Sequence, residues 1–184
     1  MVLGIDPGSV ITGWALLKNE GRKIHYVGSG ILKFDAKVEF LERLTEIQAI
    51  VRNLVRELRP DEIALESLIY VKSPTALIKL AQTRGIILSE FVENYQGRIF
   101  EYSPNLVKSS AVGHGHADKE SVRKGLDLFL GKRDYTTHDE SDAVAVALCH
   151  IINRSSNYNN KVLKNTRSKS RGLAASVGHK VRDL

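Results

Sequence analysis

The chain has 184 residues, of which 42% are hydrophobic and 26% charged, and its formal net charge is +6. This composition is typical of a globular protein and excludes disordered and fibrous classes. No apolar stretch approaches the roughly 18 residues that a membrane span requires. The apolar opening Met1–Ile5 is too short for a signal peptide and has no basic start. The single cysteine, Cys149, cannot form an internal disulfide, which favours a reducing, cytoplasmic setting.

The predicted elements alternate in a clear order along the chain. Three stretches joined by short turns predict an antiparallel meander, at 2–5, 10–17 and 24–32. Helical spacing then alternates with short apolar strands, which predicts a helix over 41–58, a strand over 63–65, a helix over 73–95, a strand over 98–102 and helices that begin at 103, 118 and 137. This order predicts an α/β fold with a mixed five-stranded sheet, three antiparallel strands followed by parallel crossovers, and helices on both faces.

The positive charge is concentrated at the C-terminal end. Residues 154–184 carry eight Lys and Arg and one Asp, whereas residues 1–153 carry 19 basic and 20 acidic side chains. Hydrophobic periodicity also stops near Asn153. We therefore predict one folded domain over 1–153 and a basic, flexible tail over 154–184. Such a tail is compatible with nucleic-acid binding, but it is equally typical of a solubilising segment.

Two of the predicted strands end in a carboxylate. Asp6 follows the strand over 2–5, and Glu66 follows the strand over 63–65. Each has an ordinary interpretation, because Asp often starts a turn and a strand-end Glu is commonly exposed. Open α/β sheets, however, build their sites at the carboxyl ends of strands. Two carboxylates at the same edge of one sheet are therefore candidate site residues.

The last predicted helix adds two more carboxylates in its first turn. Asp139 and Asp142 are three residues apart and face the same side, although the helix dipole attracts acids there without any function. The helix beyond Asp142 is apolar on all sides, so inward-facing carboxylates would need a cation. An all-oxygen cluster favours Mg²⁺ or Mn²⁺, and two such ions can serve phosphodiester cleavage. Glu140, between them, is interpreted as ordinary helix-start charge.

Four stretches of the chain together resemble the RuvC family of Holliday-junction resolvases. They are Gly4-Ile5-Asp6-Pro7-Gly8-Ser9-x-x-Thr12-Gly13, Ala64-Leu65-Glu66, Lys79-Leu80-Ala81-Gln82-Thr83-Arg84-Gly85 and Asp139-x-x-Asp142-Ala143-x-Ala145-x-Ala147. One such motif alone is weak, because Asp-x-Gly turns are common. Together their order and spacing match the family over roughly residues 1–153.

The resemblance implies a ribonuclease H-like fold, a homodimer, and paired symmetric nicking of four-way DNA junctions in recombination and repair. The family's acidic site corresponds to Asp6, Glu66, Asp139 and Asp142, which would hold two Mg²⁺ ions per site, with Mn²⁺ as a substitute. In that chemistry one ion activates the attacking water and the other stabilises the leaving 3′ oxygen. The branch-migration proteins RuvA and RuvB are implied partners.

The resemblance also implies contacts with DNA. Lys108 and Lys119 correspond to lysines that the family places against the backbone near the scissile phosphate, and Arg84 is a further predicted contact. Each lysine can equally be an ordinary solvated side chain. Three residues after its catalytic Glu the family often has Phe, where this chain has Ile69. The next residue, Tyr70, either takes over stacking on a base or packs in the core.

Small residues form a stripe along the helix predicted over 73–95. Ala81, Gly85 and Ser89 recur every four residues, so another helix could approach closely along them. The resemblance places the dimer contact around this helix, and we predict that this face helps to form it. The alternative is that the stripe packs on the chain's own sheet.

Other classes of protein fit less well. An actin-like or sugar-kinase ATPase also begins with a strand and an Asp-x-Gly turn, but it needs a duplicated domain and a second phosphate loop. A non-catalytic junction-binding protein would not need all the carboxylates, and an RNA-processing nuclease relative is not expected to match every motif. In the last predicted helix, Cys149 is predicted to lie in the core and His150 at the surface.

Overall fold

The computed structural model describes residues 1–21, 23–68 and 73–159, with side chains as far as Arg154 at the C-terminal end. The chain divides into two units, Met1–Asn153 and Arg154–Leu184. Most of the predicted basic tail therefore lies outside the described residues. Within the described part, no helix is both long and apolar enough to cross a membrane.

One sheet of five strands organises the first unit, in the order β3-β2-β1-β4-β5. The strands are β1 (Val2–Asp6), β2 (Ile11–Glu20), β3 (Lys23–Lys33), β4 (Glu62–Glu66) and β5 (Ile99–Tyr102). Pairing is antiparallel from β1 through β3 and parallel from β1 through β5. The predicted mixed sheet, a meander followed by parallel crossovers, is confirmed.

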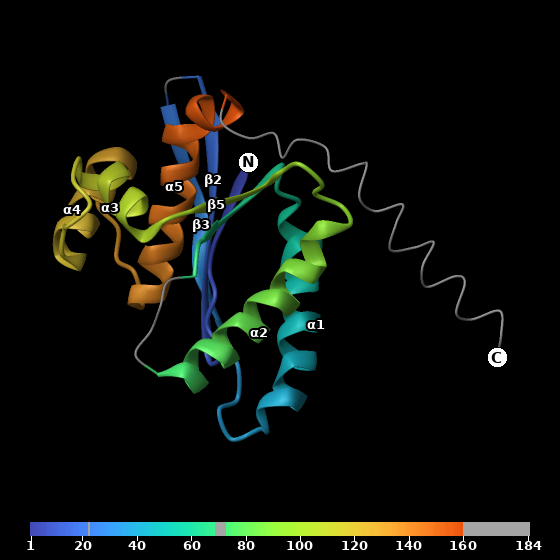
Figure 1. The fold of residues 1–184 in the computed structure, drawn as a ribbon. Coiled ribbons are helices and arrows are strands. Elements are labelled where there is room, and N and C mark those ends of the chain that lie inside the picture. Colours follow the sequence, from blue (N-terminus) through green and yellow to red (C-terminus); the bar gives the residue numbers. More distant parts are fainter. Residues whose placement is uncertain (22, 69–72, 160–184) are drawn as a thin grey trace. The chain divides into compact units, whose positions relative to one another are not determined.

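The helices cover both faces of the sheet, as predicted. They are α1 (Phe40–Leu58), α2 (Pro74–Val92), α3 (Pro104–Val112), α4 (Lys119–Leu130) and α5 (His138–Asn159). Figure 1 shows α1 and α2 on one face and α3, α4 and α5 on the other. Alternate residues of β1 enter different cores, because Leu3 and Ile5 pack with α1 and α2 whereas Val2 packs with α5. Helix α5 continues through Asn159, beyond the predicted end near Asn153.

Two glycines let α5 lie directly on the sheet. A Cβ atom at Gly4 would lie 2.3 Å from the backbone oxygen of Ala143, and one at Gly13 would lie 1.9 Å from that of Asp139. Any side chain at either position would push the helix away. Because Gly13 pairs with Asp6 across β1 and β2, this contact also sets Asp139 beside the end of β1.

A buried polar contact holds α5 to the sheet further along the helix. His150 is fully buried, so its predicted surface position is wrong. Its Nδ1 lies 2.7 Å from the hydroxyl of Tyr102 and its Nε2 lies 3.0 Å from Oε2 of Glu62. These partners on β4 and β5 offset the cost of burying the imidazole, which the helix sequence alone does not indicate.

Candidate active site

Asp6 and Glu66 lie side by side at one edge of the sheet. Each is the last residue of its strand, and β1 and β4 are parallel neighbours in which Ile5 pairs with Leu65. The buried strands leave only these terminal residues partly exposed. The predicted convergence of the two strand-end carboxylates is therefore a feature of the fold.

Hydrogen bonds from β2 and from α1 hold the turn that follows Asp6. The Thr12 hydroxyl donates to the backbone oxygen of Gly8 (3.0 Å) and accepts from its N–H (3.1 Å). The buried Arg43 reaches from α1 and donates to the backbone oxygen of Ser9 at 3.0 Å. Sequence reasoning missed Arg43. The available signal is a charged residue four positions before Ile47, on the buried face of the helix.

The first turn of α5 brings Asp139 and Asp142 to the same edge, and Glu140 anchors that turn. Glu140 is 5% exposed and accepts hydrogen bonds from Ser29 Oγ (2.6 Å) and from the backbone N–H of Thr136 (2.7 Å). Its interpretation as ordinary helix-start charge is therefore wrong. Its carboxylate fastens the start of α5 to β3, which helps to fix the two neighbouring aspartates.

The carboxylates interact strongly with one another. Burial, followed by repulsion from Asp142, Glu66 and Asp139, raises the pKa of Asp6 from 3.8 to about 8. The pKa of Glu66 is also raised, by burial and then by Asp142, while Lys108, Lys119 and Arg84 act in the opposite direction. Asp142, Glu66 and Asp139 are thus close enough to Asp6 to disfavour its ionised form.

The raised pKa of Asp6, caused by burial and then by repulsion, predicts a pH-dependent gain in stability for Asp6→Asn. The pKa of Asp6 is higher in the folded protein than in the unfolded chain, so ionisation between pH 4 and pH 8 destabilises the fold progressively. In EDTA, Asp6→Asn should have a higher Tm than the wild type at pH 8 and no advantage at pH 4. Each kcal/mol gained corresponds to roughly 2–4 °C. A Tm difference that is the same at both pH values would contradict this prediction.

The donor chemistry of the cluster fits a divalent cation. Every donor is a carboxylate oxygen, partly withdrawn from water, and hard cations prefer such donors. A positive group also contacts the cluster, because Nζ of Lys119 lies 3.4 Å from Oδ2 of Asp142. Among the described residues, no group of three or more His, Cys, Asp or Glu side chains lies close enough together to hold a metal ion as the side chains now stand. The fit therefore rests on donor type and charge.

The predicted DNA contacts have different surroundings. Lys108 and Lys119 both act electrostatically on Glu66, so both lie by the carboxylates. Arg84, by contrast, is 5% exposed and donates to the backbone oxygen of Glu66 and to Oε1 of Glu101 (2.7 Å). With its guanidinium committed to these groups, the DNA contact predicted for Arg84 is not supported, and we interpret it as a residue that positions the end of β4. Ile69 and Tyr70 lie outside the described residues.

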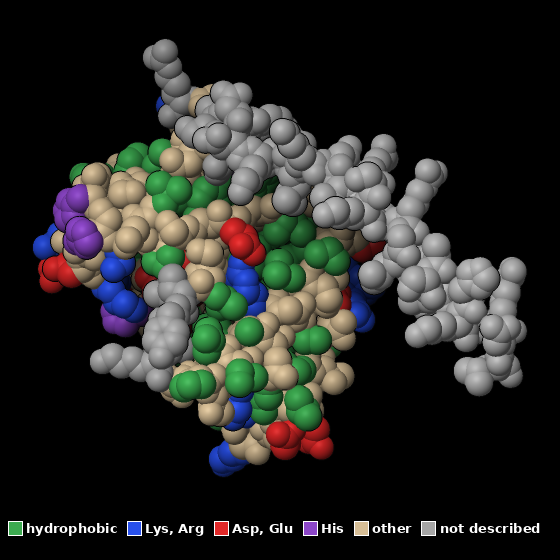
Figure 2. Space-filling view, viewed as in Figure 1, with side chains coloured by type: hydrophobic (Ala, Val, Ile, Leu, Met, Phe, Trp, Pro, Cys, Tyr) green, Lys and Arg blue, Asp and Glu red, His purple; other side chains and the backbone are tan. Residues whose placement is uncertain are grey.

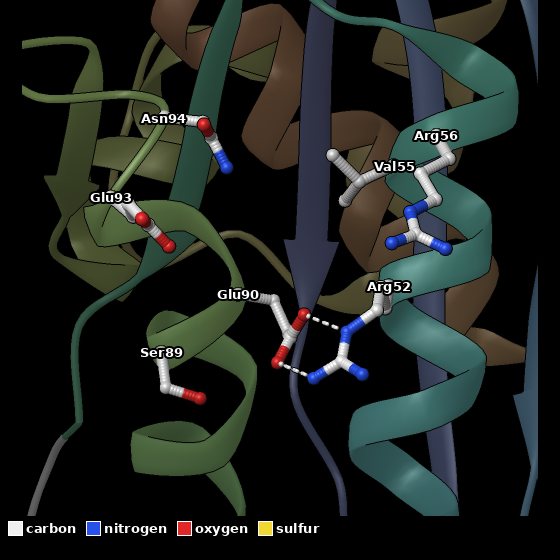
Figure 3. Close-up of a pocket in the computed structure, with 7 residues that line it drawn as sticks. All are labelled: Arg52, Val55, Arg56, Ser89, Glu90, Glu93 and Asn94. Atoms are coloured by element: carbon white, nitrogen blue, oxygen red, sulfur yellow. Dashed lines mark hydrogen bonds and ion pairs between the residues drawn. The ribbon is translucent and has the colours of Figure 1, made fainter.

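A separate pocket between α1 and α2 contains none of the candidate carboxylates or predicted DNA contacts, although Ser89 of the predicted dimer face lines it. It is lined by Arg52, Val55, Arg56, Ser89, Glu90, Glu93 and Asn94. Figure 3 shows Arg52 making a two-pronged contact with Glu90, at 2.8 and 3.0 Å. A small cleft lies beside the carboxylates and is lined in part by Asp6, Glu66 and Arg84.

Comparison with models of known protein families shows the family to which this chain belongs. A family model described as crossover junction endodeoxyribonuclease RuvC matches residues 2–150. The chain belongs to the RuvC family. The match includes all the site carboxylates together with Lys108 and Lys119, and it ends before the basic tail. The expected family, its enzymatic class as a hydrolase and the expected fold are confirmed.

Individual RuvC proteins are similar over most of their length. The crossover junction endodeoxyribonuclease RuvC of Rhizobium johnstonii is 34% identical over 157 residues, which cover 85% of this chain and 92% of the relative. The corresponding protein of Bartonella henselae is 35% identical over 83% of this chain and 90% of its own. The structure of T. thermophilus RuvC in complex with Holliday junction substrate has a TM-score of 0.77 at 28% identity, covering 85% of this chain and 95% of that one.

Proposed function

We propose that this chain is a structure-selective endonuclease that resolves four-way DNA junctions by paired symmetric nicks, in recombination and repair. The observation that carries the proposal is the convergence of the ends of β1 and β4 with the first turn of α5, which makes the pKa of Asp6 depend on Glu66, Asp139 and Asp142. This arrangement occurs in a member of a family of crossover junction endodeoxyribonucleases. A non-catalytic binder would have no need of such mutually destabilising acids.

In the proposed mechanism, Asp6, Glu66, Asp139 and Asp142 hold two Mg²⁺ ions, with Mn²⁺ as a substitute. Bound there, the ions would activate water for in-line attack on phosphorus and stabilise the leaving 3′ oxygen. The chain's own part is to keep the carboxylates in place through Glu140, Arg84 and the glycine contacts of α5. Lys108 and Lys119, placed beside Glu66, are proposed to hold the phosphates that flank the cleaved bond.

A synthetic four-way junction tests this proposal directly. Purified protein is incubated with end-labelled junction and with a linear duplex of the same sequence, with and without Mg²⁺. Paired nicks at symmetric positions, in the junction only and with metal only, are the expected result. Binding without nicking in both Mg²⁺ and Mn²⁺ would indicate a non-catalytic junction-binding protein. Equal cutting of the linear duplex would exclude selectivity for the junction.

We further propose a homodimer built on the outer face of α2. Ala81, Gly85 and Ser89 are all exposed, whereas Thr83, Arg84, Ile87 and Phe91 form the buried face of the helix. A Cβ atom at Gly85 would meet no heavy atom within 4 Å. The small-residue stripe therefore does not serve packing on the chain's own sheet, which leaves it available to a second copy.

Gly85→Leu should weaken this dimer. Leucine favours a helix, so the fold should persist, but its side chain would hold a facing helix away. We expect the dimer dissociation constant to rise about tenfold or more, which corresponds to about 1.4 kcal/mol. Sedimentation equilibrium measures the change, and Gly85→Ala, which adds only a methyl group, is the matched control. An unchanged dimer in the leucine variant would exclude this face.

The remaining expected partners and setting are part of the same proposal. RuvA and RuvB are proposed partners, and membership of the RuvC family supports them. A cytoplasmic location is supported by Cys149, the one cysteine, which is buried and free.

A further inference from the structure

A row of exposed basic residues leads away from the carboxylates along α4. Lys119 begins the helix and contacts Asp142, and Arg123 lies one turn further along the same side. One turn beyond Arg123, Asp127 accepts a hydrogen bond from the backbone N–H of Arg133 at 3.3 Å, which brings the loop after α4 into the row. Figure 2 shows Lys, Arg and His side chains, with some Asp or Glu among them, at the left, over the region of α3 and α4.

Both arginines of this row lie over aromatic rings. The Cζ of Arg123 is 5.5 Å from the ring centre of Tyr135, and that of Arg133 is 4.1 Å from the ring centre of Tyr26. Within the part of the chain that the structure describes, neither guanidinium forms an ion pair with a carboxylate. Stacking restricts an arginine while leaving its N–H groups available, so less conformational entropy is lost when it binds an anion.

The ring beneath Arg133 is connected to the active site. The hydroxyl of Tyr26 is hydrogen-bonded to Ser29 Oγ (2.7 Å), which donates to Glu140 at 2.6 Å. Glu140 lies next to Asp139 and fixes the first turn of α5. The position of the stacked arginine is therefore set relative to the carboxylates.

We propose that Arg123 and Arg133 bind backbone phosphates of a duplex arm of the junction, a few base pairs from the cleaved bond. The proposal rests on the proposed nuclease function. Two turns of α4 span about 11 Å, which equals about three base pairs of a duplex at 3.4 Å each. Arginine suits phosphate because its planar fork donates two parallel hydrogen bonds. The row thus extends the contact made by Lys119 along one arm.

The test compares the double variant Arg123→Gln/Arg133→Gln with Lys124→Gln. Lys124 is exposed on the same helix but pairs with Glu120 at 2.8 Å, so it controls for simple loss of charge on α4. Junction affinity is measured in EDTA by fluorescence anisotropy over a range of salt concentrations. The double variant should bind about tenfold or more weakly, and its log K against log salt should be less steep by about two. Lys124→Gln should resemble the wild type.

Neutral methylphosphonate linkages at about two to five nucleotides from the nick locate the contact. They should weaken binding by the wild type and have little effect on the double variant. Arg133→Lys keeps the positive charge but loses the planar guanidinium. It should bind the junction more weakly than the wild type, with a nearly unchanged slope of log K against log salt.

Three results would overturn the inference. Wild-type affinity and salt slope in the double variant, an equal loss in Lys124→Gln, or equal sensitivity of both proteins to the methylphosphonates would each exclude a specific arm contact. These results leave the nuclease proposal intact if the wild type still nicks the junction. Failure of the wild type to bind or nick a junction would remove both proposals together.

Discussion

Asp139→Asn protein is expected to bind a four-way junction with undiminished affinity and to nick it at least about 10²- to 10³-fold more slowly than the wild type. Asparagine keeps the shape of the side chain but removes the negative charge proposed to hold a metal ion. Glu66→Gln should behave in the same way, because Glu66 reaches the cluster from a different element, β4. Loss of one charge also relieves the repulsion on Asp6, so the fold should not be weakened.

Single-turnover nicking in Mg²⁺ measures the rates, and anisotropy in EDTA measures binding. Asp134→Asn and Glu57→Gln make the same chemical changes at exposed acids and should retain wild-type activity. Thermal melts establish that every variant is folded. Wild-type nicking by either Asp139→Asn or Glu66→Gln would refute the assignment of the active site.

Gly13→Ala should have the second-largest effect, although it adds only a single methyl group. The new Cβ would lie 1.9 Å from the backbone oxygen of Asp139, so the first turn of α5 must move off β2. Overpacking of this kind lowers the free energy of unfolding by about 1–3 kcal/mol. Displacing a reacting group by about 1 Å can lower a rate about 10²-fold. Activity should therefore fall much more than stability.

Chemical denaturation and nicking rates, measured on the same preparation, separate the two effects. Gly28→Ala is the matched control on the neighbouring strand, because its Cβ would meet Trp14 at an ordinary 3.8 Å. The control should keep wild-type activity. A Gly13→Ala protein with wild-type nicking would show that α5 tolerates the shift and that its approach to β2 does not set the site.

Much of the fold follows from local patterns. Strands β1 and β4 are short apolar runs that each end in an acid, and period-two and helical spacing place the elements within a few residues of their observed bounds. The β2–β3 pairing also contains a register shift between Leu16 and Leu17, next to Gly28, where a strand glycine is typical of a bulge. These features depend on neighbours in sequence, which is why the sequence predicts them.

The charged residues that become buried could not be predicted in this way. Glu140 meets Ser29 from 111 positions away, and His150 meets Glu62 from 88 positions away. Arg84 is a basic residue in a motif of a DNA-processing family, yet the ends of β4 and β5 supply acceptors that bury it. A polar group is buried only where distant partners satisfy it, and sequence spacing carries little information about such partners.

The sequence by itself thus determined the order of the elements, the carboxylates at the ends of β1 and β4 and the start of α5, and the relationship to the RuvC family. Only the tertiary structure decided how these acids meet. Gly13 lets α5 pack directly on the sheet, and Glu140 holds the first turn of α5 in place. Burial, followed by repulsion from the neighbouring acids, then raises the pKa of Asp6 to about 8. The tertiary structure also gave two of the basic residues different environments. Lys119 contacts Asp142 at the protein surface, whereas Arg84 is buried. The physical reason is that local pattern selects elements, whereas burial and charge interaction depend on contacts that only folding creates.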